Sequence, residues 1–144
     1  MQWPIWSDMT RSIPVQAVPA ELTADDAAHD ECGVLGLSTP HGDGVAQLAF
    51  FGLFALQHRG QEAAGIAVSD GKRARVHKEP GLVSTVFSPE ALKPLTGYHA
   101  IGHTRYSTTG SNAERNIQPF LVETMHGPLS VAHNGNLVNA TALR

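Results

Sequence analysis

The stretch Asp30-Glu31-Cys32-Gly33-Val34-Leu35-Gly36 divides the chain into two unlike parts. It contains the single cysteine of the 144 residues, and it opens the part of the chain that has the pattern of a folded domain. A Cys-Gly pair ahead of a β-prone run predicts a thiol at the tip of a strand, with Gly33 letting the backbone pass close to a ligand. A second interpretation is a small buried hydrophobe, because free cysteine is among the most buried residue types. Cys32 alone leaves both interpretations open.

The part of the chain before Cys32 differs from the rest in charge and in pattern. Residues 1–31 hold six acidic residues and one basic residue, a net charge of −5, and they include Pro4, Pro14 and Pro19. Residues 32–144 hold nine basic and seven acidic residues, a net charge of +2. Because residues 1–31 show no sustained helix or strand period, we expect a poorly ordered leader that ends at Glu31.

The composition limits the class of protein. A length of 144 residues corresponds to about one domain, and 42% apolar residues suffice for a core. A net charge of −3 and a pI near 6.2 give no electrostatic footprint for nucleic acid or a membrane surface. One cysteine excludes an intrachain disulfide and a multi-cysteine metal site. Without an apolar run of about 18 residues or a signal sequence, the expected compartment is the cytoplasm.

Periodicity and turn signals predict a mixture of strands and helices. The helix expected at 45–57 is apolar around nearly its whole circumference, so we expect it to be buried on more than one side. Asp43 suits its N-cap, and Gly60 suits the left-handed position after its end. Turns at Asp70-Gly71 and around Gly127 predict two hairpins, hence antiparallel sheets with helices on their faces, an α+β fold. The other expected elements are strands at 33–39, 64–69, 73–77, 98–104, 120–123 and 129–133, and helices at 82–87, 89–95 and from 139. The helix at 89–95 is expected to have Ser88 at its N-cap and Pro89 at its first position.

Polar residues at the ends of these elements provide the parts needed for acyl transfer. A thiol attacks a carbonyl, and the developing oxyanion needs fixed donors, which Asn134 and Gly135 can supply. The rigid fork of Arg105 suits a carboxylate. No histidine base for the thiol is evident. Cleavage between Glu31 and Cys32 would create an α-amino group with a pKa of ~7.7–8.0, which can accept the thiol proton.

Each of these residues also has a structural explanation. Asn134-Gly135 is typical of a type I′ hairpin turn, and Arg105 also suits a solvated strand end or an ion pair. Arg59 near a helix end is accounted for by the helix dipole. His99 and His103 lie on one face of a predicted strand, but two ligands without a third do not make a metal site, so no metal is expected.

Five segments in this order and spacing resemble a known family. They are ECGVLGL (31–37), LQHRGQEAAGIAV (56–68), GLVSTVF (81–87), GHTRYSTTG (102–110) and AHNGNLVNATALR (132–144). From Glu31 to Arg144 the chain resembles the glutaminase domain of the amidophosphoribosyltransferases (glutamine phosphoribosylpyrophosphate amidotransferases), which are class II glutamine amidotransferases. Glucosamine-6-phosphate synthase, asparagine synthetase and glutamate synthase share this domain and are the alternatives. The sequence QHRGQ at 57–61 favours the enzymes of purine synthesis.

The resemblance implies an N-terminal-nucleophile αββα sandwich with antiparallel sheets, incomplete in this chain. The implied reaction is hydrolysis of glutamine to glutamate and ammonia through a thioester on Cys32, which is freed by removal of the leader. Asn134 and Gly135 match the oxyanion hole of the family. The substrate-binding residues implied by position are Arg105 for the α-carboxylate, Thr108 in a loop that contacts glutamine, and Arg59 and Gly60 in the helix-end loop beside the nucleophile.

The resemblance also implies a domain organisation. Residues 1–31 correspond to a propeptide, as in the branch of the family that is processed and carries a 4Fe-4S cluster. Residues 32–144 correspond to the N-terminal part of the glutaminase domain, and the phosphoribosyltransferase domain is absent from the sequence. We therefore expect a fragment that is inactive alone, with no cofactor in this chain. Phosphoribosyl pyrophosphate, Mg²⁺ and any cluster would bind the missing domain, and the full-length protein would form a homo-oligomer. A catalytically incompetent fragment is the other alternative.

Overall fold

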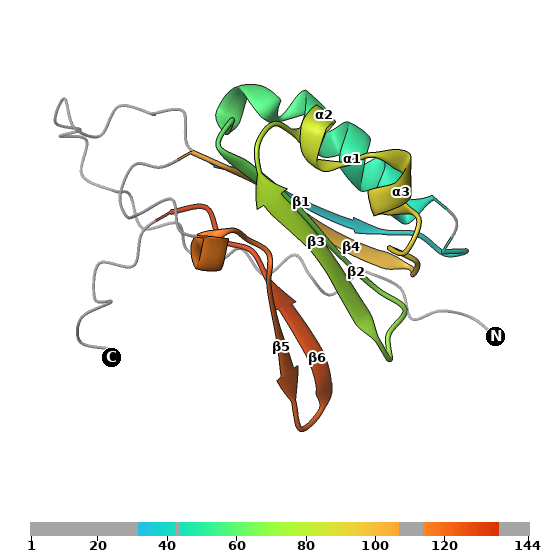
Figure 1. Cartoon of the computed structure of the whole chain (residues 1–144). Helices are drawn as coiled ribbons and strands as arrows, with labels where there is room; N and C mark the ends of the chain where they lie inside the picture. Colours follow the sequence, from blue (N-terminus) through green and yellow to red (C-terminus); the bar gives the residue numbers. More distant parts are fainter. Residues whose placement is uncertain (1–31, 43, 107–113, 136–144) are drawn as a thin grey trace, which may run out of the picture.

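The structure, a computed structural model, describes residues 32–42, 44–106 and 114–135. A four-stranded antiparallel sheet has the order β1-β4-β2-β3, and β5 and β6 form a separate antiparallel pair. Helices α1, α2 and α3 lie on one face of the larger sheet, whereas the β5–β6 hairpin and the short helix at 114–116 lie on the other side (Figure 1). The α+β class with antiparallel sheets is therefore confirmed. The strands are β1 (Gly33–Ser38), β2 (Ala63–Ser69), β3 (Ala74–Pro80), β4 (His99–Arg105), β5 (Phe120–Thr124) and β6 (Gly127–Val131), and the helices are α1 (Val45–Ala55), η2 (Gln57–Arg59), α2 (Val83–Val86), α3 (Pro89–Leu92) and η3 (Glu114–Asn116).

The turn signals predict the hairpins correctly. Gly71 has a φ of 85°, and the Asp70 carboxylate accepts hydrogen bonds from the main-chain N–H groups of Lys72 (2.8 Å) and Arg73 (2.7 Å). These two bonds lower the pKa of Asp70. β3 continues to Pro80, beyond the predicted end at residue 77, and an edge strand tolerates a proline because no further strand needs its N–H.

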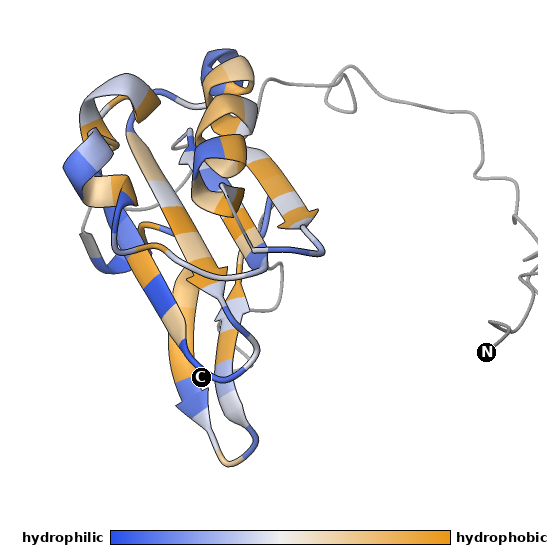
Figure 2. Ribbon diagram, turned by 90° about the vertical axis from the view of Figure 1, so that its right-hand side faces the viewer, coloured by the Kyte–Doolittle hydropathy of each residue, from blue (hydrophilic) through white to orange (hydrophobic). Residues whose placement is uncertain are grey.

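Helix α1 is buried on part of its circumference and exposed on the rest. Its residues Val45, Ala46, Ala49 and Leu53 are buried against the sheet, but Leu48, Phe51 and Phe54 on the opposite side are 51%, 64% and 55% exposed. The hydrophobic colour of α1 in Figure 2 therefore includes a side that the sheet does not cover. Helix α2 also packs against α1, and the Phe50 ring contacts that of Phe87, so α1 is buried toward the sheet and toward α2 but not on its remaining side.

The helix ends give a mixed outcome. Ser88 is the N-cap of α3 as the Ser-Pro pattern indicates, since its hydroxyl accepts a hydrogen bond from the N–H of Ala91 (3.2 Å). Gly44, with φ 75°, occupies the N-cap of α1, and Asp43 lies outside the described residues. The left-handed conformation expected at Gly60 is wrong, because its φ of −166° and ψ of 123° are extended.

The core lies between the sheet and the helices. It contains alternate residues of β2, namely Ala64, Ile66 and Val68, together with Leu53 of α1 and Val83 of α2. The side chains between them point to the other face of the sheet, because successive strand residues alternate. No helix among the described residues is long and apolar enough to cross a membrane.

Candidate functional site

Cys32 and Arg105 lie at the same end of the larger sheet. β1 pairs with β4 from Gly33 opposite Thr104, so the next position places Cys32 opposite Arg105. The Cys32 Sγ accepts a hydrogen bond from the main-chain N–H of Tyr106 (3.3 Å) and lies 3.5 Å from the carbonyl oxygen of Tyr106. The thiol is half-buried at the tip of β1 and is not part of the core. This placement matches the strand-tip position indicated by the sequence.

The structure shows one reason for glycine at position 33. Its N–H donates a hydrogen bond of 3.1 Å to the Thr104 hydroxyl, and Thr104 is fully buried. A Cβ at position 33 would come within 2.6 Å of that oxygen. The glycine therefore allows the buried hydroxyl to hold the strand at the residue next to Cys32.

The turn that follows α1 packs against the same end of β4. A Cβ at Gly60 would lie 2.7 Å from the main-chain carbons of Thr104 and Arg105, so this position requires glycine for close approach. The Gln57 side chain fixes the turn by donating to the Gly60 carbonyl and accepting a hydrogen bond of 2.6 Å from the Val83 N–H. Arg59 lies half-buried in this turn.

The Arg105 side chain lies on the face of β4 away from α1 and toward η3. Its Nη1 donates a hydrogen bond of 2.8 Å to the carbonyl oxygen of Asn116. One side of the guanidinium fork is thus held by the main chain, which fixes its direction at the end of the strand. Thr108 lies outside the described residues.

Asn134 and Gly135 follow β6 and are exposed. Gly135 has a φ of 133°, a conformation that favours glycine. The main chain of His133, directly before them, accepts and donates hydrogen bonds with the Gln118 side chain. Among the described residues no hydrogen bond joins Asn134 to Cys32, and the connection between the two regions runs through residues 116–118.

His103 is a buried polar residue that the sequence analysis considered only as one of two possible metal ligands, with His99. Its side chain is fully buried on the same face of β4 as Arg105, and neither ring nitrogen has a hydrogen-bond partner. Burial lowers the pKa of His103 to about 4, an effect that the nearby main chain of His133 opposes and the Arg105 charge reinforces. The imidazole is therefore neutral at pH 7.

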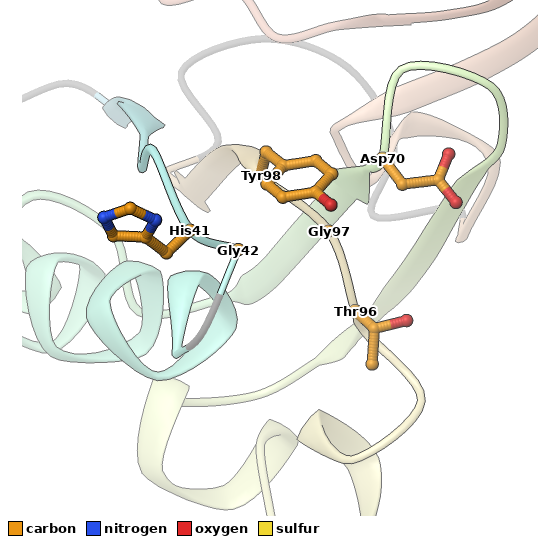
Figure 3. Close-up of a pocket in the computed structure, with 6 residues that line it drawn as sticks. All are labelled: His41, Gly42, Asp70, Thr96, Gly97 and Tyr98. Carbon is orange, nitrogen blue, oxygen red and sulfur yellow. The ribbon is translucent and has the colours of Figure 1, made fainter.

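A surface pocket lies at the opposite end of the sheet from Cys32 (Figure 3). Its volume is about 260 Å³, just below the ~300–1,000 Å³ of ligand sites. Its one carboxylate, Asp70, is already used by the β2–β3 turn. The pocket is lined by His41, Gly42, Asp70, Thr96, Gly97 and Tyr98. The described residues also contain no group of three or more His, Cys, Asp or Glu side chains placed to hold a metal.

Sequence analysis did not identify Thr104, Lys78 or Gln118, which organise the surroundings of the site. Lys78 of β3 donates hydrogen bonds to the carbonyl oxygens of Ile117 (2.5 Å) and Pro119 (3.2 Å). Gln118 binds the main chain of His133. Their partners lie 15 to 71 residues away in the sequence, so no local pattern marks them.

Comparison with known proteins identifies relatives of this chain. The curated amidophosphoribosyltransferase of Synechococcus elongatus is 55% identical over 138 residues, which cover 92% of this chain and 28% of that protein. The amidophosphoribosyltransferase of Methanocaldococcus jannaschii is 53% identical and covers 78% of this chain and 24% of its own length. The amidophosphoribosyltransferase of Drosophila melanogaster is 46% identical over 94% of this chain and 26% of that protein. The chain thus spans about a quarter of the length of the curated relatives that it matches.

Solved structures show the same similarity. One is described as the allosteric regulatory enzyme of purine biosynthesis, with a TM-score of 0.70 and 45% identity over 76% of this chain and 23% of that one. The glutamine phosphoribosylpyrophosphate amidotransferase of B. subtilis, complexed with ADP and GMP, has a TM-score of 0.67 at the same identity and coverage. The family model for class II glutamine amidotransferases matches residues 32–144 and begins at Cys32. Residues 32–144 therefore belong to the class II glutamine amidotransferases.

Proposed function

We propose that this chain is the N-terminal part of a glutaminase domain in which Cys32 attacks the side-chain amide of glutamine. The observation that carries the proposal is the position of Cys32 opposite Arg105 at one end of the β1–β4 pair. The thiol nucleophile and a guanidinium group that can bind a carboxylate thus lie at the ends of neighbouring strands. The family match that begins at Cys32 supports residues 1–31 as a propeptide and 32–144 as the domain.

The proposed chemistry follows from the groups at this end of the sheet. With residues 1–31 removed, the α-amino group of Cys32, with a pKa of ~7.7–8.0, takes the thiol proton. The sulfur bonds to the amide carbon of glutamine, and the carbon–nitrogen bond then breaks. The departing nitrogen takes the proton and leaves as ammonia. Water hydrolyses the resulting γ-glutamyl thioester to glutamate and restores the thiol.

The remaining site residues bind the substrate and the developing charge. Arg105 would bind the α-carboxylate of glutamine, and Thr108, Arg59 and Gly60 would border the substrate. The Asn134 side-chain amide and the Gly135 N–H would donate to the oxyanion that forms when the thiol attacks. In the structure Asn134 is exposed directly after His133, so a ligand can reach its side-chain amide.

The relatives indicate where the ammonia goes. The names of the curated relatives and of one solved structure support an acceptor reaction in which ammonia and phosphoribosyl pyrophosphate give 5-phosphoribosylamine. We assign phosphoribosyl pyrophosphate, its Mg²⁺ and any 4Fe-4S cluster to the part of the relatives that this chain does not cover. A homo-oligomer in the cytoplasm belongs to the same proposal.

The test uses the full-length gene product, purified from an expression host. Its mass and N-terminal sequence should show Cys32 as the first residue, and glutamine should be hydrolysed with release of ammonia. The Cys32→Ala variant should lose glutamine-dependent product while ammonia-dependent synthesis survives. An active wild-type enzyme that retains residues 1–31, or a Cys32→Ala variant that still forms product from glutamine, would contradict the proposal.

A further inference from the structure

Residues 116–119, here called the bridging segment, contact both halves of the proposed site. At one end the carbonyl oxygen of Asn116 accepts the hydrogen bond from Arg105 Nη1, at 2.8 Å. Two residues later the Gln118 side chain pairs with the main chain of His133, the residue before Asn134. We propose that Gln118 is a positioning residue, which holds the Asn134-Gly135 turn in register with Arg105. This inference rests on the function proposed above.

The Gln118 amide makes both hydrogen bonds that the main chain of His133 can offer. Its Oε1 accepts from the His133 N–H at 2.6 Å, and its Nε2 donates to the His133 carbonyl oxygen at 3.2 Å. Only a primary amide presents a donor and an acceptor side by side without charge. Asn134 follows His133 directly, with Cα atoms about 3.8 Å apart, so fixing both main-chain groups of His133 limits the positions of the Asn134 amide.

The bridging segment is in turn fastened to the larger sheet. Lys78 of β3 donates to the carbonyl oxygens on either side of Gln118, those of Ile117 and Pro119, and its ammonium lies 5.1 Å from the centre of the Phe120 ring. Burial lowers the pKa of Lys78, which agrees with its position beneath the segment. On β2, a Cβ at Gly65 would overlap the carbonyl oxygen of Gln118, so the segment lies directly on the strand.

A purely structural role for Gln118 is the competing explanation. The β5–β6 register pairs Phe120 with Val131, and two steps further it places Gln118 opposite His133. The side chain could thus simply extend the hairpin ladder past Pro119, which has no N–H to donate. The two roles differ in what they affect: positioning alters the rate of the step that forms the oxyanion, whereas ladder closure alters stability alone.

The test compares Gln118→Ala and Gln118→Glu with wild type in the full-length gene product. Glutamate keeps an acceptor for the His133 N–H but loses the donor, and it sets a carboxylate against the His133 carbonyl oxygen. Because a shift of about 1 Å in a catalytic group can cost about 10²-fold, we expect kcat for glutamine hydrolysis to fall about 10- to 100-fold in both variants. KM for glutamine should change less than about twofold, since Arg105 keeps its own contact with Asn116.

Two further measurements separate positioning from a general loss of structure. Alkylation of Cys32 by iodoacetamide forms no oxyanion, so its rate should stay near that of wild type in both variants. Gln47→Glu makes the same substitution at an exposed position on α1 and should leave kcat, KM and the alkylation rate unchanged. A full kcat in the folded Gln118 variants, or a loss of kcat matched by an equal loss of alkylation rate, overturns the inference. A Cys32→Ala enzyme that still hydrolyses glutamine instead overturns the proposed function itself.

Discussion

Acidification should destabilise the protein through His103. Its pKa is about 4 in the folded chain and 6.5 when unfolded, so between these values the unfolded state binds more protons. Stability is therefore fully present above pH 6.5 and falls as the pH drops toward 4. Linkage across these two pKa values gives a loss of about 2 kcal/mol in the free energy of unfolding between pH 7.5 and pH 5.

The surroundings of His103 agree with a loss of stability on acidification. Its neighbours in register are Val34 on β1 and Gly65 on β2, neither of which titrates. The charged groups that act on it, Arg105 and a protonated His133, oppose its protonation. Neither ring nitrogen makes a hydrogen bond among the described residues, and the nearby main chain of His133 offsets only part of the cost of burying a charged imidazole.

The assay is urea unfolding at pH 7.5 and pH 5.0 for wild type, His103→Leu and His99→Leu. Leucine is similar in size and does not titrate, so His103→Leu should lose about 2 kcal/mol less than wild type on acidification. His99 lies on the same strand but is exposed, and its replacement serves as the matched control. If the wild-type and His103→Leu proteins lose the same free energy between the two pH values, the buried imidazole does not carry the effect.

Four further substitutions test the site, each in the full-length gene product. Cys32→Ala should abolish glutamine-dependent synthesis but spare ammonia-dependent synthesis, and loss of both activities would contradict separate sites for the two reactions. Asn134→Ala should lower the glutaminase rate by roughly 10²–10³-fold, and an unchanged rate would remove it from the oxyanion role. Arg105→Lys should raise KM for glutamine because a point charge cannot replace the fork, so unaltered saturation kinetics would count against it. Gly65→Ala should lower kcat for glutamine hydrolysis as the Gln118 variants do, because the added methyl group would displace the bridging segment. An unchanged kcat in Gly65→Ala would show that the segment can move without effect.

Much of the fold could be predicted because its signals are local. Asp70-Gly71 and the Ser88 cap depend on groups within three residues of each other, and both have the expected hydrogen bonds. The exposed side of α1 could not be predicted. Apolar residues indicate that a surface favours burial, but they do not indicate which other element covers it. Gly60 shows the same limit, because its need for glycine comes from the backbone of β4 and not from the end of the helix.

The candidate site follows the same division between local and distant signals. Cys32, Arg105 and Asn134 were identified because their side chains suit a reaction and stand at the ends of strands. Gln118 carries no such signal, since its importance comes entirely from His133, which lies 15 residues away. A glutamine in a polar loop is ordinary in sequence, and only the pairing of its amide with one main-chain residue distinguishes it. Supporting residues of this kind decide whether a set of reactive groups is held closely enough to act, and they become visible when the chain is folded.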